Sequence, residues 1–329
     1  SWKMNVKKVK EISPYSFYPS PKVKSTILVF EPKKNYYNIK DCKNLEYPED
    51  EDQMVLVKLL RVDQWSKNLI IFLIPIGRGS TETSDWITLF YVFFGLSLLA
   101  SAGYVINDIK DRDSDIRHPY KKNRPIASGK ISVRLSLFYV VILCLIAFII
   151  LLQFNKLTIF LGLGSMLLAF SYPFMKRITY WPQLFLGLTF NWGIIMAWSS
   201  IMGNISINIG ILYISAIFWT LGYDTIYGTQ DLVDDEIIGN KSTSIKFKDK
   251  LKLFVGTCYA INIILITYLF YVTGNFKYSI FFIFMYFLTL MYQLKIFSKD
   301  NPKKCLDAFK LNNFSGLILF ASIILINLG

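Results

Sequence analysis

A first group of acidic side chains follows an apolar segment, within the stretch NDIKDRDSD at residues 107–115. On a helix, side chains three, four or seven residues apart lie on one face. This spacing brings together four oxygen-bearing side chains, those of Asn107, Asp108, Asp111 and Asp115. Like charges at these spacings repel one another, and more strongly beside a membrane than in water. We therefore expect a cation to balance them.

A second group repeats this arrangement in the stretch DTIYGTQDLVDD at residues 224–235, which also follows an apolar run. On a continuous helix, Asp224, Asp231 and Asp235 would form one stripe. Hard divalent cations prefer carboxylate and amide oxygens, and Mg²⁺ is commonly shared between carboxylates and substrate phosphates. Because no Cys or His accompanies the aspartates of either group, the sequence favours Mg²⁺ over zinc.

Basic residues lie close to both acidic groups. The loop after the first group contains KKNRP, in which Lys121, Lys122 and Arg124 can bind phosphate oxygens. Carboxylates, a metal ion and cationic side chains around one cavity at the membrane edge would form a diphosphate site. For either group alone, a solvated loop at the membrane surface is an equally good interpretation, but two matched groups favour the diphosphate site.

The segments that position these residues are predicted to be membrane helices. The chain has 329 residues, of which 53% are hydrophobic, and this is too apolar for an ordinary soluble domain of that length. Several stretches approach the ~20 apolar residues that a bilayer core requires. They predict an all-α polytopic membrane protein with nine transmembrane helices, at residues 56–76, 86–106, 133–152, 157–175, 181–201, 208–228, 251–273, 278–297 and 311–328.

The distribution of charge predicts the orientation of these helices. Lys and Arg gather in the loops after the second, fourth, sixth and eighth helices, which places these loops and the N-terminus on the cytoplasmic or matrix side. The formal net charge of +13 then reflects topology and a bound anion, so no nucleic acid partner is expected. The four cysteines have no ligand spacing and there is one histidine, so neither a zinc site nor a disulfide framework is indicated.

Residues 1–53 differ from the rest because they are polar, rich in lysine and interrupted by proline, with a strand-like segment at 25–30. Residues 1–47, and most clearly ISPYSFYPSPKVKSTILVFEPK at 12–33, resemble a fragment of ribosomal RNA adenine dimethyltransferases. The glycine-rich cofactor loop and catalytic motif of that family are missing, so no methyltransferase activity is expected. We expect a soluble, poorly ordered remnant joined to a membrane domain at 54–329.

Three motifs resemble the signatures of the UbiA superfamily of intramembrane prenyltransferases: NDxxDxxxD at 107–115, YPFMK at 172–176 and YDxxYxxxDxxxD at 223–235. The resemblance covers about residues 54–329 and implies nine helices around a central cavity. It implies catalytic roles for Tyr172 and the six aspartates of the two groups. The same resemblance implies a Mg²⁺ site formed by Asn107, Asp108, Asp111, Asp115, Asp224, Asp231 and Asp235.

Different parts of the chain resemble different members of this superfamily. Residues 171–193 and 223–243 resemble 4-hydroxybenzoate polyprenyltransferases of ubiquinone synthesis. Residues 61–75 and 101–132 are more similar to decaprenyl-phosphate phosphoribosyltransferases. The favoured interpretation is Mg²⁺-dependent transfer of a polyprenyl group from its diphosphate to 4-hydroxybenzoate, in a bacterial or mitochondrial inner membrane.

This interpretation gives roles to further polar residues. Tyr172 would shelter an allylic cation with its ring face. Arg61 would pair with the acceptor carboxylate, although it can equally extend to the membrane surface. The other expected substrate contacts are Asn68, Lys121, Lys122, Arg124, Lys176, Asn191 and Lys241.

Three alternatives remain open at this stage. The first keeps the metal site but transfers a phosphoribosyl group from phosphoribosyl diphosphate to a polyprenyl phosphate, with Lys67 and Asn68 in contact with phosphate or sugar. The second is a nonenzymatic ion carrier that uses the carboxylates as a permeation site. The third is an inactive hybrid whose two halves do not share a working pocket.

Overall fold

The computed structural model describes residues 4–12, 25–32, 51–72, 74, 82–117, 121–274 and 276–323. The chain divides into two compact units, Ser1–Gln53 and Met54–Gly329. In the first unit, β1 (Met4–Ile12) pairs with β2 (Ser25–Pro32) as an antiparallel hairpin, with an irregularity between Lys8 and Lys10. The strand predicted at residues 25–30 is therefore confirmed.

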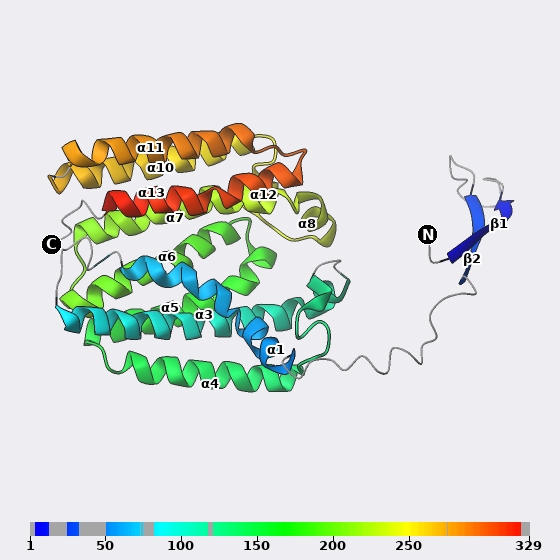
Figure 1. The fold of residues 1–329 in the computed structure, drawn as a ribbon, viewed down its shortest axis with the longest axis horizontal. Coiled ribbons are helices and arrows are strands. Elements are labelled where there is room, and N and C mark those ends of the chain that lie inside the picture. The colour runs from blue at the N-terminus through cyan, green and yellow to red at the C-terminus, as the bar shows by residue number, and fades with distance from the viewer. Residues whose placement is uncertain are drawn as a thin grey trace. The chain divides into compact units, whose positions relative to one another are not determined.

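The second unit is helical (Figure 1). Two of its elements, η3 and η4, are 3-10 helices. In chain order its helices are α1 (Glu51–Leu60), which begins in the first unit, η3 (Val62–Phe72), α3 (Thr83–Arg117), η4 (Lys121–Asn123), α4 (Val133–Leu151), α5 (Lys156–Ile178), α6 (Pro182–Met202), α7 (Ile207–Thr229), α8 (Leu232–Ile238), α9 (Thr243–Lys246), α10 (Leu251–Val272), α11 (Phe276–Ile296), α12 (Pro302–Lys310) and α13 (Asn312–Ile323).

Seven helices in the described part of the chain are long and apolar enough to cross a membrane, namely α3, α4, α5, α6, α7, α10 and α11. They coincide with seven of the nine predicted spans and make this an integral membrane protein. The predicted span 56–76 is not one α-helix, because α1 ends at Leu60 and Arg61 has a φ of 49° before η3 begins. The predicted span 311–328 contains α13, and its last five residues lie outside the described residues.

The packing separates lipid-facing helices from those that carry the polar residues. Helix α4 packs on α3, and its apolar surface is largely exposed, as at Phe138 and Ile149. Helices α6 and α7 pack on each other and are the most buried of the membrane-spanning helices. Side-chain caps set the starts of α4, α5 and α7, where Ser132, Asn155 and Ser206 each accept a backbone N–H. The bundle therefore has a protected interior between α3, α5, α6 and α7.

Candidate active site

A cavity of about 850 Å³ lies between α3, α5, α6 and α7, with η3 and the segment 231–242 completing its wall. Its lining changes character along α3, from Leu96 and Leu99 to Asp111 and Asp115. Since an α-helix rises about 1.5 Å per residue, Leu96 and Asp115 lie roughly 28 Å apart along α3. The cavity is thus long, with apolar residues lining one part and ionisable residues lining another.

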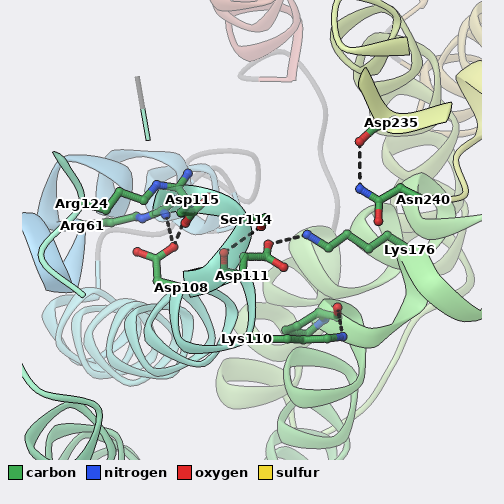
Figure 2. A network of polar contacts seen from close by, with 11 residues as sticks. Arg61, Asp108, Lys110, Asp111, Ser114, Asp115, Arg124, Lys176, Asp235 and Asn240 are labelled. Carbon is green, nitrogen blue, oxygen red and sulfur yellow. Dashed lines mark hydrogen bonds and ion pairs between the residues drawn. The ribbon is translucent and has the colours of Figure 1, made fainter. Parts of the chain in front are cut away.

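The first acidic group divides into residues that face the cavity and one that does not. Asn107, Asp111 and Asp115 line the cavity, as their helical spacing predicted. Asp108 is 2% exposed and is not among the lining residues. Its Oδ1 instead accepts hydrogen bonds from Arg61 Nη2 at 2.5 Å and from Arg124 Nη1 at 3.0 Å (Figure 2). Asp108 therefore contacts two arginines and is not among the residues that line the cavity, while its expected role as a metal ligand stays a prediction.

Arg61 and Arg124 come from segments far apart in the sequence and meet at this carboxylate. Arg124 Nη1 also pairs with Asp115 Oδ2 at 2.8 Å, and the Arg61 guanidinium lies 4.9 Å from the centre of the Tyr104 ring. Both arginines line the cavity. Because Asp108 and Asp115 are 2% and 4% exposed, their charges need these partners. The result is a network in which two guanidinium groups at the cavity are held in place by two buried carboxylates.

A lysine from α5 reaches the next aspartate of α3. Lys176 Nζ pairs with Asp111 Oδ2, and both residues line the cavity (Figure 2). Lys110 immediately precedes Asp111, and its Nζ donates to Pro173 O and lies 3.8 Å from the centre of the Phe174 ring, which ties α3 to α5. The two lysines thus fix the distance between the first acidic group and the YPFMK motif.

The second acidic group is not the single helical stripe that the spacing suggested. Helix α7 ends at Thr229, and Asp231 occupies the N-cap position of the separate helix α8. Despite this break, Asp224, Asp231 and Asp235 all line the same cavity as Asp111. Asn240 Nδ2 donates to Asp235 Oδ1 at 2.9 Å (Figure 2). The structure therefore brings both acidic groups to one cavity, although the expected helix continuity was wrong.

Most of the remaining expected substrate contacts also line the cavity, namely Asn68, Lys121, Tyr172 and Lys241. Lys122 is exposed and is not among the lining residues. Asn191 is 4% exposed and also lies outside the lining. Its amide nitrogen donates to Gly187 O and to Thr220 Oγ1, each at 2.9 Å. The expectation that Asn191 faces the cavity is therefore wrong, because its polar group is satisfied between α6 and α7.

Several polar lining residues were not predicted. They include Tyr227 on α7, Gln183 on α6 and the loop residues Asn240 and Ser242. A signal was present for Gln183, because an amide at the edge of an apolar span needs a hydrogen-bond partner. Nothing in the spacing pointed to Asn240, whose place follows from how its loop folds back on Asp235.

The donor set fits Mg²⁺ by chemistry. The acidic groups supply carboxylate and amide oxygens, which a hard cation prefers, and no Cys or His is among the described residues that line the cavity. In the described part of the chain, no three acidic, His or Cys side chains are already gathered as a metal-binding group. The carboxylates of Asp111 and Asp115 contact Lys176 and Arg124 instead.

Comparisons with known proteins agree with the resemblance of the sequence motifs to one family. The UbiA prenyltransferase family matches residues 69–316. Bovine mitochondrial 4-hydroxybenzoate polyprenyltransferase is 38% identical over 83% of this chain and 75% of its own length. The 4-hydroxybenzoate octaprenyltransferase of Vibrio parahaemolyticus is 35% identical over 71% of this chain and 83% of its own. The Arabidopsis thaliana mitochondrial 4-hydroxybenzoate polyprenyltransferase is 44% identical, but the match covers 54% of this chain and 43% of that protein.

Solved structures show the same fold at lower identity. A digeranylgeranylglyceryl phosphate synthase matches with a TM-score of 0.66 and 20% identity, over 83% of this chain and 98% of the other. A UbiA homologue from Archaeoglobus fulgidus, bound to DMAPP and Mg²⁺, matches with a TM-score of 0.64 and 20% identity, over 83% and 99%. The family match begins at residue 69, so the methyltransferase resemblance of residues 1–47 gains no support from it. The chain belongs to the UbiA prenyltransferase family.

Proposed function

We propose that this protein transfers a polyprenyl group from polyprenyl diphosphate to 4-hydroxybenzoate in a Mg²⁺-dependent reaction. The observation that carries the proposal is that side chains of both acidic groups line one cavity together with six basic residues, and that this cavity continues into an apolar part. The basic residues are Arg61, Lys121, Arg124, Lys176, Arg177 and Lys241. The names of the bovine and Vibrio relatives support the choice of acceptor.

The residues that would hold Mg²⁺ are the acidic and amide side chains of the lining, namely Asn107, Asp111, Asp115, Asp224, Asp231 and Asp235. When bound, the metal would neutralise charge on the diphosphate as it leaves. The Archaeoglobus structure with DMAPP and Mg²⁺ supports this choice of ion. Asp108 would act indirectly, by holding Arg61 and Arg124 in place.

The basic side chains would bind the diphosphate and stabilise it after the bond to the allylic carbon breaks. Lys176 and Arg124 pair with Asp111 and Asp115, two lining carboxylates that would hold Mg²⁺. Their charged groups would therefore lie close to a diphosphate bound to that ion. Tyr172 lines the cavity and would shield the allylic cation with its ring face. The apolar residues Leu96, Leu99 and others of the lining would hold the chain and exclude water.

The acceptor would lie where its ring can reach the allylic carbon. A new carbon–carbon bond forms at the ring position beside the hydroxyl, and the ring proton then leaves to restore aromaticity. Arg61 is a candidate partner for the acceptor carboxylate, since it lines the cavity and is 24% exposed at its side chain. Asn68 lines the same wall and donates to Ser97 Oγ at 3.0 Å.

The proposal includes the arrangement in the membrane. The segments 56–76 and 311–328 would complete nine spans around the cavity, with the basic loops on the cytoplasmic or matrix side, as the distribution of Lys and Arg favours. Residues 1–53 would be a separate appendage that takes no part in the reaction, which is consistent with the division of the chain after Gln53.

The test is a transfer assay with the full chain purified into lipid nanodiscs. Polyprenyl diphosphate, labelled 4-hydroxybenzoate and Mg²⁺ should give a labelled lipid, whereas phosphoribosyl diphosphate with a polyprenyl phosphate should give none. The matched variants are Asp111→Asn, which changes a lining carboxylate, and Asp113→Asn, which changes an exposed one on the same helix. Product from the phosphoribosyl pair alone, or equal product from both variants, would contradict the proposal.

A further inference from the structure

A glutamine that neither acidic motif contains connects two walls of the cavity. Gln183 lies in the first turn of α6, is 6% exposed and lines the cavity. Its side-chain Oε1 accepts the backbone N–H of Thr243 at 3.0 Å. Thr243 begins α9, immediately after the segment 239–242 that forms part of the cavity wall. One buried amide thus holds a loop that comes 60 residues later in the chain.

Other hydrogen bonds fix the same loop from two further sides. The N–H of Lys241 donates to Lys176 O at 2.7 Å, which attaches the loop to α5. The hydroxyls of Thr225 and Thr243 lie 2.7 Å apart, and Ser244 Oγ donates to Thr225 O at 2.8 Å, which attaches it to α7. These two threonines and Ser244 are 0% exposed. Gln183 supplies the side-chain attachment to α6.

The packing around this attachment leaves little freedom. A Cβ atom added at Gly228 would lie 2.9 Å from Ser244 Oγ and 3.2 Å from Gln183 Nε2. Contacts of that length are tighter than side chains normally adopt, so the backbone of α7 approaches the amide closely at this point. The Gln183 side chain is therefore confined between α7 and the loop.

The loop that Gln183 holds carries polar groups of the candidate site. Asn240, Lys241 and Ser242 line the cavity. Asn240 bonds to Asp235 twice, with its side chain to Oδ1 at 2.9 Å and with its N–H to the backbone oxygen at 2.9 Å. A shift of the loop at Thr243 would therefore move Asn240, and with it the carboxylate of Asp235.

We propose that Gln183 is a positioning residue for the metal and diphosphate part of the site. It fixes the segment 240–243 so that Asp235, Asn240 and Lys241 face the cavity together. This inference rests on the proposed function, in which these groups bind Mg²⁺ and diphosphate. It assigns to Gln183 no contact with the acceptor and no part in the bond-making step.

The test compares Gln183→Met, which keeps the length of the side chain but loses the acceptor oxygen, with Gln183→Glu, which keeps an acceptor. Gln153→Met is the matched control, because Gln153 is exposed at the end of α4. In the full chain in nanodiscs, hydrogen exchange of the segment 240–246 should speed up in Gln183→Met and stay slow in Gln183→Glu. The control should behave as the wild type.

Binding and kinetics then separate positioning from simple stability. In Gln183→Met, calorimetric binding of inorganic diphosphate with Mg²⁺ should weaken about tenfold, the size expected from loss of one buried hydrogen-bond partner. The KM for the prenyl donor should rise by a similar factor, while kcat and the KM for 4-hydroxybenzoate change little. Unchanged exchange, or faster exchange with unchanged diphosphate binding, would overturn the inference. Absence of any prenyl transfer by the wild type would overturn the proposed function, whereas the exchange and binding comparisons decide the role of Gln183.

Discussion

Asp108 offers the sharpest test of how the site is supported, because its contacts give it a role that its motif does not. The change is Asp108→Ala. It removes a carboxylate that is 2% exposed. The guanidinium groups of Arg61 and Arg124 then lose the Asp108 oxygen that lies 2.5 Å and 3.0 Å from them. Removing one member of a buried ion pair costs about 3–5 kcal/mol.

The surroundings of the two arginines narrow the expected loss of stability in Asp108→Ala. The side chains of Arg61 and Arg124 are 24% and 26% exposed, so water can solvate them in part. Arg124 also keeps Asp115 at 2.8 Å. We therefore expect a loss near the lower end, about 3 kcal/mol. With an entropy of unfolding of about 2.1 cal/mol/K per residue, a chain of 329 residues loses roughly 1.5 °C in Tm per kcal/mol, so the expected fall in Tm is about 4 °C.

The assay is thermal unfolding of the purified protein, followed by prenyl transfer over a range of Mg²⁺ concentrations. Asp113→Ala is the control, because this exposed residue of the same helix should change stability by less than about 0.5 kcal/mol. If Asp108 positions the arginines, excess Mg²⁺ will not restore activity in Asp108→Ala. An unchanged Tm together with activity that returns at high Mg²⁺ would refute this reasoning and make Asp108 a metal ligand.

Three further predictions follow from the same geometry. Asp231→Asn should lower the transfer rate by about 100-fold or more, because it removes a lining carboxylate that, on the proposed function, holds Mg²⁺ against the leaving diphosphate, while Asp113→Asn should not lower it. Chelation with EDTA should abolish transfer in the same assay, and added Mg²⁺ should restore it; transfer that persists in EDTA would exclude the metal. Asn191→Leu should lower the free energy of unfolding by about 1–3 kcal/mol, because it removes the hydrogen bonds to Gly187 and Thr220. A change in the KM of either substrate would instead show that this side chain reaches the cavity.

The first acidic group could be predicted from spacing because α3 continues without a break from Thr83 to Arg117. Helical period alone then puts Asn107, Asp111 and Asp115 on one face. The same reasoning failed after α7, where Thr229 Oγ1 donates to the backbone oxygen of Thr225 at 2.8 Å and the helix ends. The spacing of the aspartates carries no signal for this break, which lies at Gln230 and Asp231 between α7 and α8.

Pairings between distant segments were outside the reach of spacing arguments. Arg61 and Asp108 are 47 residues apart, and the polar edge of the first span gave no indication that they meet. Asn191 was expected in the cavity because an amide inside a span needs a partner. That physical premise holds, but the partner is Thr220 on the neighbouring helix α7. Sequence thus predicts that a buried polar group is satisfied, but not by which neighbour.

The ion pair between Lys176 and Asp111 leads to one more prediction, with effects of opposite sign. Both residues line the cavity, so Lys176 occupies the carboxylate that a metal would need while also being a candidate phosphate contact. In Lys176→Met, Asp111 is released for a cation, but a charge that would bind diphosphate is lost.

The expected change in Mg²⁺ affinity follows from the solvent exposure of the Lys176–Asp111 pair. The side chains of Lys176 and Asp111 are 29% and 10% exposed, so the pair is partly screened and contributes about 1 kcal/mol. Calorimetry with Mg²⁺ alone should therefore show binding about fivefold tighter in Lys176→Met than in the wild type. Binding of diphosphate in the presence of Mg²⁺ should become weaker by a similar factor. Lys122→Met, at an exposed position outside the cavity lining, should change neither. If the effect came only from loss of a positive charge, Lys122→Met would show the same shifts in affinity. Opposite shifts for Mg²⁺ and diphosphate, seen in Lys176→Met alone, would therefore show that Lys176 leaves Asp111 and binds phosphate when the substrate binds.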